Sequence, residues 1–158
     1  MSTKPAKRKS ILVIDRRDKH GSGSLEKARV FENHQEVFDA ITDAFPSHKV
    51  VNVRCSDLSV KDQVALFHDA DGVVGAEGAC LANVLYMRAG ATVVNILPAA
   101  ASYGGIETLC GFSLYWQIAN LSGARYWAFL LREYAQETMR VPINRLRAFL
   151  AGNGVLGG

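Results

Sequence analysis

The chain has no long hydrophobic run. Its longest stretch without a charged residue, 89–106, is interrupted by Gly90 and Pro98, and a membrane span requires about 20 consecutive apolar residues. The first residues also lack the apolar core of a secretion signal. We therefore expect a protein without a membrane span that is located in the cytoplasm.

Cysteine and histidine are scarce. The three cysteines, Cys55, Cys80 and Cys110, stand at spacings that fit no zinc template, and no two histidines pair at metal-ligand spacing. No metal site and no cofactor are therefore expected. Each cysteine lies in or beside apolar sequence, where a reduced, buried thiol is common. We expect reduced cysteines and a reducing compartment.

The chain has no large excess of charge of one sign. The formal net charge is +3, and the basic residues before the first apolar run exceed that value: Lys4, Lys7, Arg8 and Lys9. The remaining body is therefore nearly neutral, which argues against a nucleic-acid partner. A length of 158 residues is typical of one domain. We expect a disordered basic tail at 1–10, a single domain at 11–152 and a flexible tail at 153–158.

Three common catalytic or nucleotide-binding motifs are missing. No Gly-Lys-Ser/Thr follows a glycine-rich turn, no Gly-x-Ser-x-Gly elbow occurs, and Gly21-Ser22-Gly23-Ser24 lacks the third glycine of the dinucleotide fingerprint. A Walker-type nucleotidase, an elbow-type serine hydrolase and a dinucleotide-binding dehydrogenase are therefore not supported. A flavodoxin-like regulator would need an acidic cluster or an FMN loop at the strand ends, and the sequence has neither.

Short apolar runs alternate with helical patterns. The pattern predicts strands at 11–14, 49–54, 72–75, 92–97 and 113–118. It predicts helices at 37–45, with Asn33 as the cap, and at 59–67, 78–87, 106–110 and 142–150. The region 124–138 fits a strand or a helix. Such alternation predicts an α/β fold: a Rossmann-like parallel sheet of about five strands with helices on both faces, in three layers.

Ligands of such sheets bind beyond the carboxyl ends of the strands, near a change in strand order. The loops at this edge begin at Asp15, Arg54, Gly75 and Leu97. Residues 75–79 join a strand directly to a predicted helix. Small residues allow close approach of the backbone, and a helix start offers unpaired N–H groups, so this loop suits a phosphate or diphosphate. The alternative is a tight turn whose glycines only permit packing.

Other candidates lie around this loop. The Glu77 carboxylate can accept hydrogen bonds from sugar hydroxyls, or it is a solvated acid at a helix start. Arg16 and Arg17 follow the first strand and Arg29 ends the next loop; guanidinium groups there can clamp phosphate, although solvated surface arginines are common. Tyr103 belongs to a lid or to an ordinary surface loop.

The segment 58–83 resembles glycosyltransferase family 61. It carries the family's leucine-serine start, a Gln-Val pair, a phenylalanine, an alanine and a Gly-x-x-Gly-Ala-x-Leu-x-Asn block, at Leu58-Ser59, Gln63-Val64, Phe67, Ala70 and 75–83. Upstream, Arg16 or Arg17 and the run from Arg29 through Asn33 to Glu36 look like the family's arginine and asparagine motif. Downstream, 141–146 resembles its closing helix. The likeness covers about 10–150.

The resemblance implies a GT-B-like enzyme of polysaccharide biosynthesis, of which this chain matches the carboxyl-side half that holds the nucleotide-sugar. The implied reaction transfers a sugar from a donor, UDP-linked, to a glycan or protein acceptor with inversion and without a metal. The implied donor-binding residues are Arg16, Arg29, Gly75, Ala76, Gly78, Ala79, Asn83, Asn95 and Tyr103, with Glu77 as the catalytic candidate. Two positions depart from the family pattern: Glu77 replaces a histidine and Asn95 replaces a frequent glutamate.

A second hypothesis is a non-catalytic module that has kept the fold and lost the chemistry. It rests on the two departures and on the lack of an acceptor-binding half in the matched region. Such a module would bind a second copy of itself, or a separate chain that supplies the acceptor half, through the apolar segment 126–131.

Overall fold

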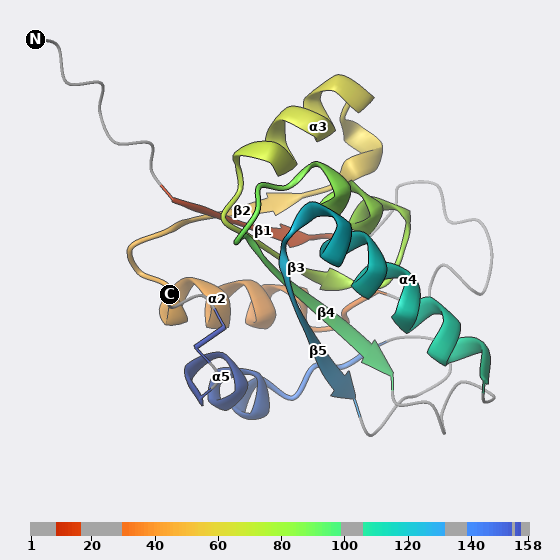
Figure 1. Cartoon of the computed structure of the whole chain (residues 1–158). Coiled ribbons are helices and arrows are strands. Elements are labelled where there is room, and N and C mark those ends of the chain that lie inside the picture. Colours follow the sequence, from red (N-terminus) through yellow and green to blue (C-terminus); the bar gives the residue numbers. More distant parts are fainter. Residues whose placement is uncertain (1–8, 17–29, 99–105, 132–138, 153, 156–158) are drawn as a thin grey trace, which may run out of the picture.

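The computed structural model describes residues 9–16, 30–98, 106–131, 139–152 and 154–155, with the backbone alone described for 106–113. Its strands form one parallel sheet in the order β2-β1-β3-β4-β5 (Figure 1). These strands are β1 (Ser10–Ile14), β2 (Lys49–Val53), β3 (Gly72–Ala76), β4 (Thr92–Pro98) and β5 (Arg125–Leu131). The expected five-stranded α/β fold is confirmed.

The strand order changes direction between β1 and β3. From β1 the chain moves outward to β2, and then returns to the other side of β1 to add β3, β4 and β5. The register pairs Val13 with Val74, so β1 and β3 end at almost the same level. Ligands of open parallel sheets bind at such a point. The fold therefore places the residues that follow β1 and β3 at the expected binding edge.

Two helical layers cover the sheet (Figure 1). The helices α2 (His34–Ala44) and α5 (Ile143–Gly152) lie on one face. The other face carries α3 (Val60–Asp69), the 3-10 helix η2 (Ala79–Tyr86) and α4 (Ile106–Ser122). Along β1, Ile11 and Val13 face the first layer and Leu12 and Ile14 face the second. Burial on both faces explains why the middle strands β1, β3 and β4 are mainly apolar in sequence.

The two predicted helix caps have different outcomes. Ser59 caps α3 as expected, because its hydroxyl accepts a hydrogen bond from the backbone N–H of Asp62. Asn33 stands at the N-cap position of α2 as expected, but its side chain makes no capping bond to a backbone N–H of that helix. Instead, the Asn33 amide donates to the Val141 carbonyl at 2.9 Å and accepts from the Val141 N–H at 3.0 Å. Asn33 therefore joins the start of α2 to the segment that precedes α5.

The fifth strand lies later in the chain than expected. The strand predicted at 113–118 is wrong: that segment and the short helix predicted at 106–110 form one helix, α4. Tyr115, Ile118 and Ala119 have helical spacing and pack against the sheet. Gly123, at a φ of 73°, ends the helix, and the Ala124 N–H returns to the Ala119 carbonyl. The region 124–138, for which the sequence fitted a strand or a helix, contains β5.

The helix predicted at 78–87 is a 3-10 helix rather than an α-helix. Its first internal bond joins the Leu81 N–H to the Gly78 carbonyl at 2.8 Å. The turn is therefore tighter than in an α-helix. The N–H groups of Ala79 and Cys80 precede that bond, so the helix itself supplies them with no acceptor.

The expectation of reduced cysteines is wrong for one pair. Cys55, in the 3-10 turn η1 (Cys55–Asp57) after β2, forms a disulfide with Cys80 in η2. The spacing of the two residues in the sequence does not reveal this pair, because the sheet order alone brings the end of β2 close to η2. Disulfides are rare in a reducing cytoplasm, so the pair does not support the expected compartment. Of the helices in the described segments, none is long and apolar enough to cross a bilayer.

Candidate functional site

Arg16 reaches from the end of β1 to the loop that follows β3. Its Nη1 donates a hydrogen bond to the backbone carbonyl of Glu77. The same guanidinium lies where a Cβ atom at Gly78 would be, so any other residue at that position would collide with it. Gly78 has φ 155° and ψ 174°, a combination that is essentially restricted to glycine. The structure thus brings together Arg16 and the loop predicted to meet phosphate.

The start of η2 lies beside this guanidinium. The N–H groups of Ala79 and Cys80 come before the first internal bond of the helix. Backbone N–H groups at a helix start attract anions, and a neighbouring guanidinium adds a full positive charge. Arg16 is half-buried, which weakens the screening of that charge by water. The local field at this point of the edge favours a negatively charged group.

A second arginine at this edge is held by carboxylates. Arg54, which follows β2, contacts the buried Asp15 carboxylate at 2.9 Å and Asp57 at 3.6 Å. The Asp15 N–H also donates to the Val53 carbonyl. This ion pair fixes the carboxyl ends of β1 and β2 to each other. The sequence marked the loops at both positions but gave no indication that the two side chains would pair.

Asn95 in β4 and Tyr126 in β5 form a polar pair near the Glu77 loop. Asn95 is fully buried in β4, and its Nδ2 donates to the Tyr126 hydroxyl oxygen at 2.9 Å. Burial raises the pKa of Tyr126 to about 12; the hydrogen bond from Asn95 opposes this shift, and the nearby Glu77 and Tyr115 add to it. Tyr126 is therefore a neutral phenol at physiological pH. The sequence reasoning missed it as a site residue, because its apolar neighbours gave no polar signal.

The other polar atom of the Asn95 amide, Oδ1, is also buried. It has no hydrogen-bond partner within the described part of the chain. Buried polar atoms are nearly always paired, so an unpaired one is unusual. The position is also the one at which the family resemblance expects a glutamate. The Asn95 Oδ1 atom therefore accepts no hydrogen bond from the described residues.

Three of the predicted donor contacts have packing roles in this structure. A Cβ atom at Gly75 would lie 2.8 Å from the Cβ of Ile14, so glycine is required by the close approach of β1 and β3. Ala76 is buried among the side chains below α2 and α5. The Asn83 amide donates to Gln63 Oε1 at 2.8 Å and to the Cys80 carbonyl at 3.1 Å, which ties η2 to α3. Contact of these residues with a donor stays a prediction.

The predicted residues Arg17, Arg29 and Tyr103 lie outside the described residues. Among the residues that are described, no three histidine, cysteine, aspartate or glutamate side chains gather where they could hold a metal ion. The polar groups that the edge brings together are therefore Arg16, the start of η2, Glu77 and the pair Asn95 and Tyr126.

Comparison with protein families identifies a matching family model. The model of the family described as Glycosyltransferase 61 matches residues 1–94. No curated protein matches the chain. The matched region includes Arg16, Glu77 and Gly78 and ends within β4, just before Asn95.

Proposed function

This chain belongs to glycosyltransferase family 61, and we propose that it binds the nucleotide-sugar donor at the carboxyl ends of β1 and β3. Members of such a family transfer a sugar from a donor to an acceptor. The proposal rests above all on one observation: the Arg16 guanidinium is bonded to the Glu77 carbonyl beside Gly78, at the point where the strand order reverses. The donor that the resemblance favours is UDP-linked, and the acceptor is a glycan or a protein.

The diphosphate of the donor would rest on the start of η2. Its oxygens would accept hydrogen bonds from the Ala79 and Cys80 N–H groups and from Arg16. A guanidinium carries five N–H donors, and the bond to the Glu77 carbonyl fixes its orientation. Positive charge placed here in advance stabilises the negative charge that grows on the diphosphate as it leaves. In this proposal Arg16 and the helix N–H groups carry out that neutralisation.

In this proposal Glu77 acts on the sugar side of the same loop. Its carboxylate would accept hydrogen bonds from sugar hydroxyls, or take the proton of the acceptor hydroxyl as general base. In a single displacement, the acceptor oxygen bonds to the anomeric carbon while the bond to the diphosphate breaks, and the configuration is inverted. The nucleoside diphosphate leaves with the bonding electrons.

Titration calorimetry with UDP, UDP-sugars, GDP-sugars and CMP-sugars tests the proposal. Hydrogen bonds between charged groups contribute about 1.5–3 kcal/mol each, and about 1.4 kcal/mol corresponds to a tenfold change in affinity. Arg16→Ala should therefore weaken nucleotide binding by about tenfold or more. Arg147→Ala is the matched control, because Arg147 pairs with Asp43 at 2.8 Å on the exposed side of α2 and α5.

The outcomes separate the alternatives. If no nucleotide binds to the unaltered chain, donor binding is excluded and the non-catalytic module becomes the better hypothesis. If a nucleotide binds equally well to Arg16→Ala, the chain binds a donor elsewhere and the assigned position is wrong. Selective loss of UDP-sugar binding in Arg16→Ala supports both the donor class and its position.

A further inference from the structure

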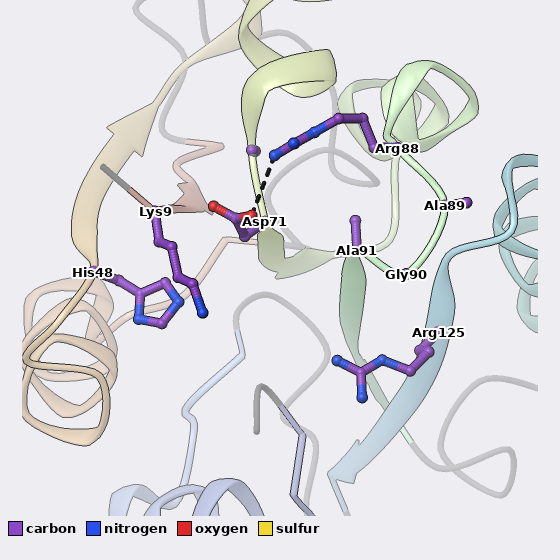
Figure 2. A pocket seen from close by; sticks show the side chains of 9 residues that line it. Lys9, His48, Asp71, Arg88, Ala89, Gly90, Ala91 and Arg125 are labelled. Atoms are coloured by element: carbon purple, nitrogen blue, oxygen red, sulfur yellow. Dashed lines mark hydrogen bonds and ion pairs between the residues drawn. The ribbon is translucent and has the colours of Figure 1, made fainter. Parts of the chain in front are cut away.

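A polar pocket lies at the opposite edge of the sheet. It has a volume of about 270 Å³ and is formed where the strands begin rather than where they end (Figure 2). The residues that line it are Lys9, His48, Ala70, Asp71, Arg88, Ala89, Gly90, Ala91 and Arg125. Family membership and the proposed donor site give this edge no role.

Positive charge exceeds negative charge in this pocket. Lys9, Arg88 and Arg125 face a single carboxylate, Asp71. That carboxylate is already engaged, since Oδ1 pairs with Arg88 at 3.2 Å and Oδ2 accepts the Ser10 N–H at 2.9 Å. Within the described residues, Lys9 and Arg125 have no acidic partner, and the Arg125 side chain makes one hydrogen bond, to the Thr92 hydroxyl at 3.1 Å. The described part of the chain thus offers these two cationic side chains no compensating carboxylate.

These two cations come from strands on either side of β3 and β4. Lys9 precedes β1 and Arg125 begins β5, three strand spacings away, or about 14 Å. Figure 2 shows both side chains directed toward the middle of the pocket, with Arg88 turned toward Asp71 instead. Backbone N–H groups at this edge are used within the sheet: the Thr92 N–H bonds to the Asp71 carbonyl and the Arg125 N–H to the Ala91 carbonyl. Recognition here would therefore depend on side chains.

His48 adds a titratable group. Its pKa is lowered by burial and by the positive charge of Lys9, while Asp71 acts in the opposite direction. Its Nδ1 is 3.1 Å from the Ser47 hydroxyl. An anion in the pocket would offset the charge of Lys9 and make the imidazolium form more favourable. The pKa of His48 should then rise when the pocket is filled, which provides a local reporter.

We propose that this pocket binds the phosphate group of a small phosphorylated ligand. The lining side chains carry a net charge of +2 at neutral pH when His48 is neutral. A phosphate monoester carries about −1.5 to −2 at pH 7, so it matches that charge better than a carboxylate does. Small-molecule sites have volumes of about 300–1,000 Å³, which makes a pocket of about 270 Å³ suitable for a phosphate with a small attached group.

NMR titration of the full chain with inorganic phosphate and with glucose 6-phosphate tests this inference, at constant ionic strength and with chloride and acetate as controls. Both phosphates should shift the backbone signals around Lys9, His48 and Arg125, and should raise the pKa of His48. Lys9→Gln and Arg125→Gln, both at exposed positions, should weaken binding at least tenfold. Arg147→Gln, on the exposed side of α5, should bind phosphate like the unaltered chain.

Two results would overturn the inference. Equal shifts with acetate or chloride at the same ionic strength would show that the pocket does not select phosphate. Unchanged phosphate binding in Arg125→Gln would place the ligand elsewhere. The inference is separable from the donor site: Arg16→Ala should leave phosphate binding at this edge unchanged, and Arg125→Gln should leave UDP-sugar binding unchanged.

Discussion

Opening the disulfide between Cys55 and Cys80 should make the domain less stable without unfolding it. The two residues are separated by 25 positions, and the loop-entropy relation for a closed loop of that length gives about 3.5 kcal/mol at 25 °C. This contribution acts on the unfolded chain, which the disulfide keeps from expanding. For a protein of this size, each 1 kcal/mol shifts the melting temperature by about 2–4 °C. The expected fall is therefore about 7–14 °C.

The native contacts around the disulfide should hold the two segments in place after reduction. Gln63 Nε2 donates to the Cys55 carbonyl at 3.0 Å, and the Asn83 amide joins Gln63 to the Cys80 carbonyl. The folded state can thus survive the loss of the covalent link. Urea denaturation with and without reductant measures the change, and the double variant Cys55→Ser/Cys80→Ser should reproduce it. Cys110→Ser serves as the control for removal of a cysteine.

Thiol titration provides an independent check. The chain has three cysteines, so the denatured, unreduced protein should show one reactive thiol if this pair is bonded. Three reactive thiols would refute the assignment. Equal urea midpoints in the presence and absence of reductant would refute the stabilising effect while leaving the covalent link intact.

Three further changes have defined outcomes. Gly78→Ala places a methyl group in the space of the Arg16 guanidinium, and the backbone conformation at this position costs a non-glycine residue about 1–3 kcal/mol. The urea midpoint and the nucleotide affinity should both fall. Gly152→Ala, whose methyl group would meet no atom within 4 Å, should change neither. Asn83→Ala removes the bonds to α3 and to its own helix and should cost about 1–3 kcal/mol; unchanged stability in denaturant would show those bonds to be unimportant. The pKa of Tyr126 is raised to about 12 in the folded chain from its ordinary 10. Its contribution to the free energy of unfolding is therefore present below pH 10 and is lost as the pH rises through 12. Tyr126→Phe should abolish that loss when unfolding is measured against pH, and a pH profile identical to that of the unaltered chain would contradict it.

The middle of the sheet could be predicted from the sequence because β1, β3 and β4 are buried on both faces. Runs such as Ile11-Leu12-Val13-Ile14 admit few other structures in a chain of this length. The proximity of Arg16 to the Gly78 loop also followed from the sequence, since parallel strands bring their carboxyl ends to one edge. Gly78 could also be predicted, because its backbone conformation favours glycine and a glycine-containing loop pattern can be seen in the sequence.

The features that the sequence did not predict depend on contacts between distant segments. The segment from Ser113 to Ile118 is apolar enough for a strand, and only its packing on the sheet selects the helix. A glycine at 123 was the sequence signal that could have shown where that helix ends, because helices often end at a glycine with positive φ. The Cys55 disulfide depends on the order of β2, β1 and β3, which spacing does not encode. Tyr126 becomes a polar site residue because Asn95 lies next to it on the neighbouring strand.

The double hydrogen bond between Asn33 and Val141 has a consequence for how the protein can be divided. It joins positions 108 residues apart, and Leu146 and Leu150 of α5 fill the same core as Val37 and Ile41 of α2. A fragment that stops at residue 94, where the family match ends, would expose that core and leave a buried amide without a partner. The region by which the family is recognised therefore lacks β5 and α5, and we expect a stably folded domain to require the chain through α5.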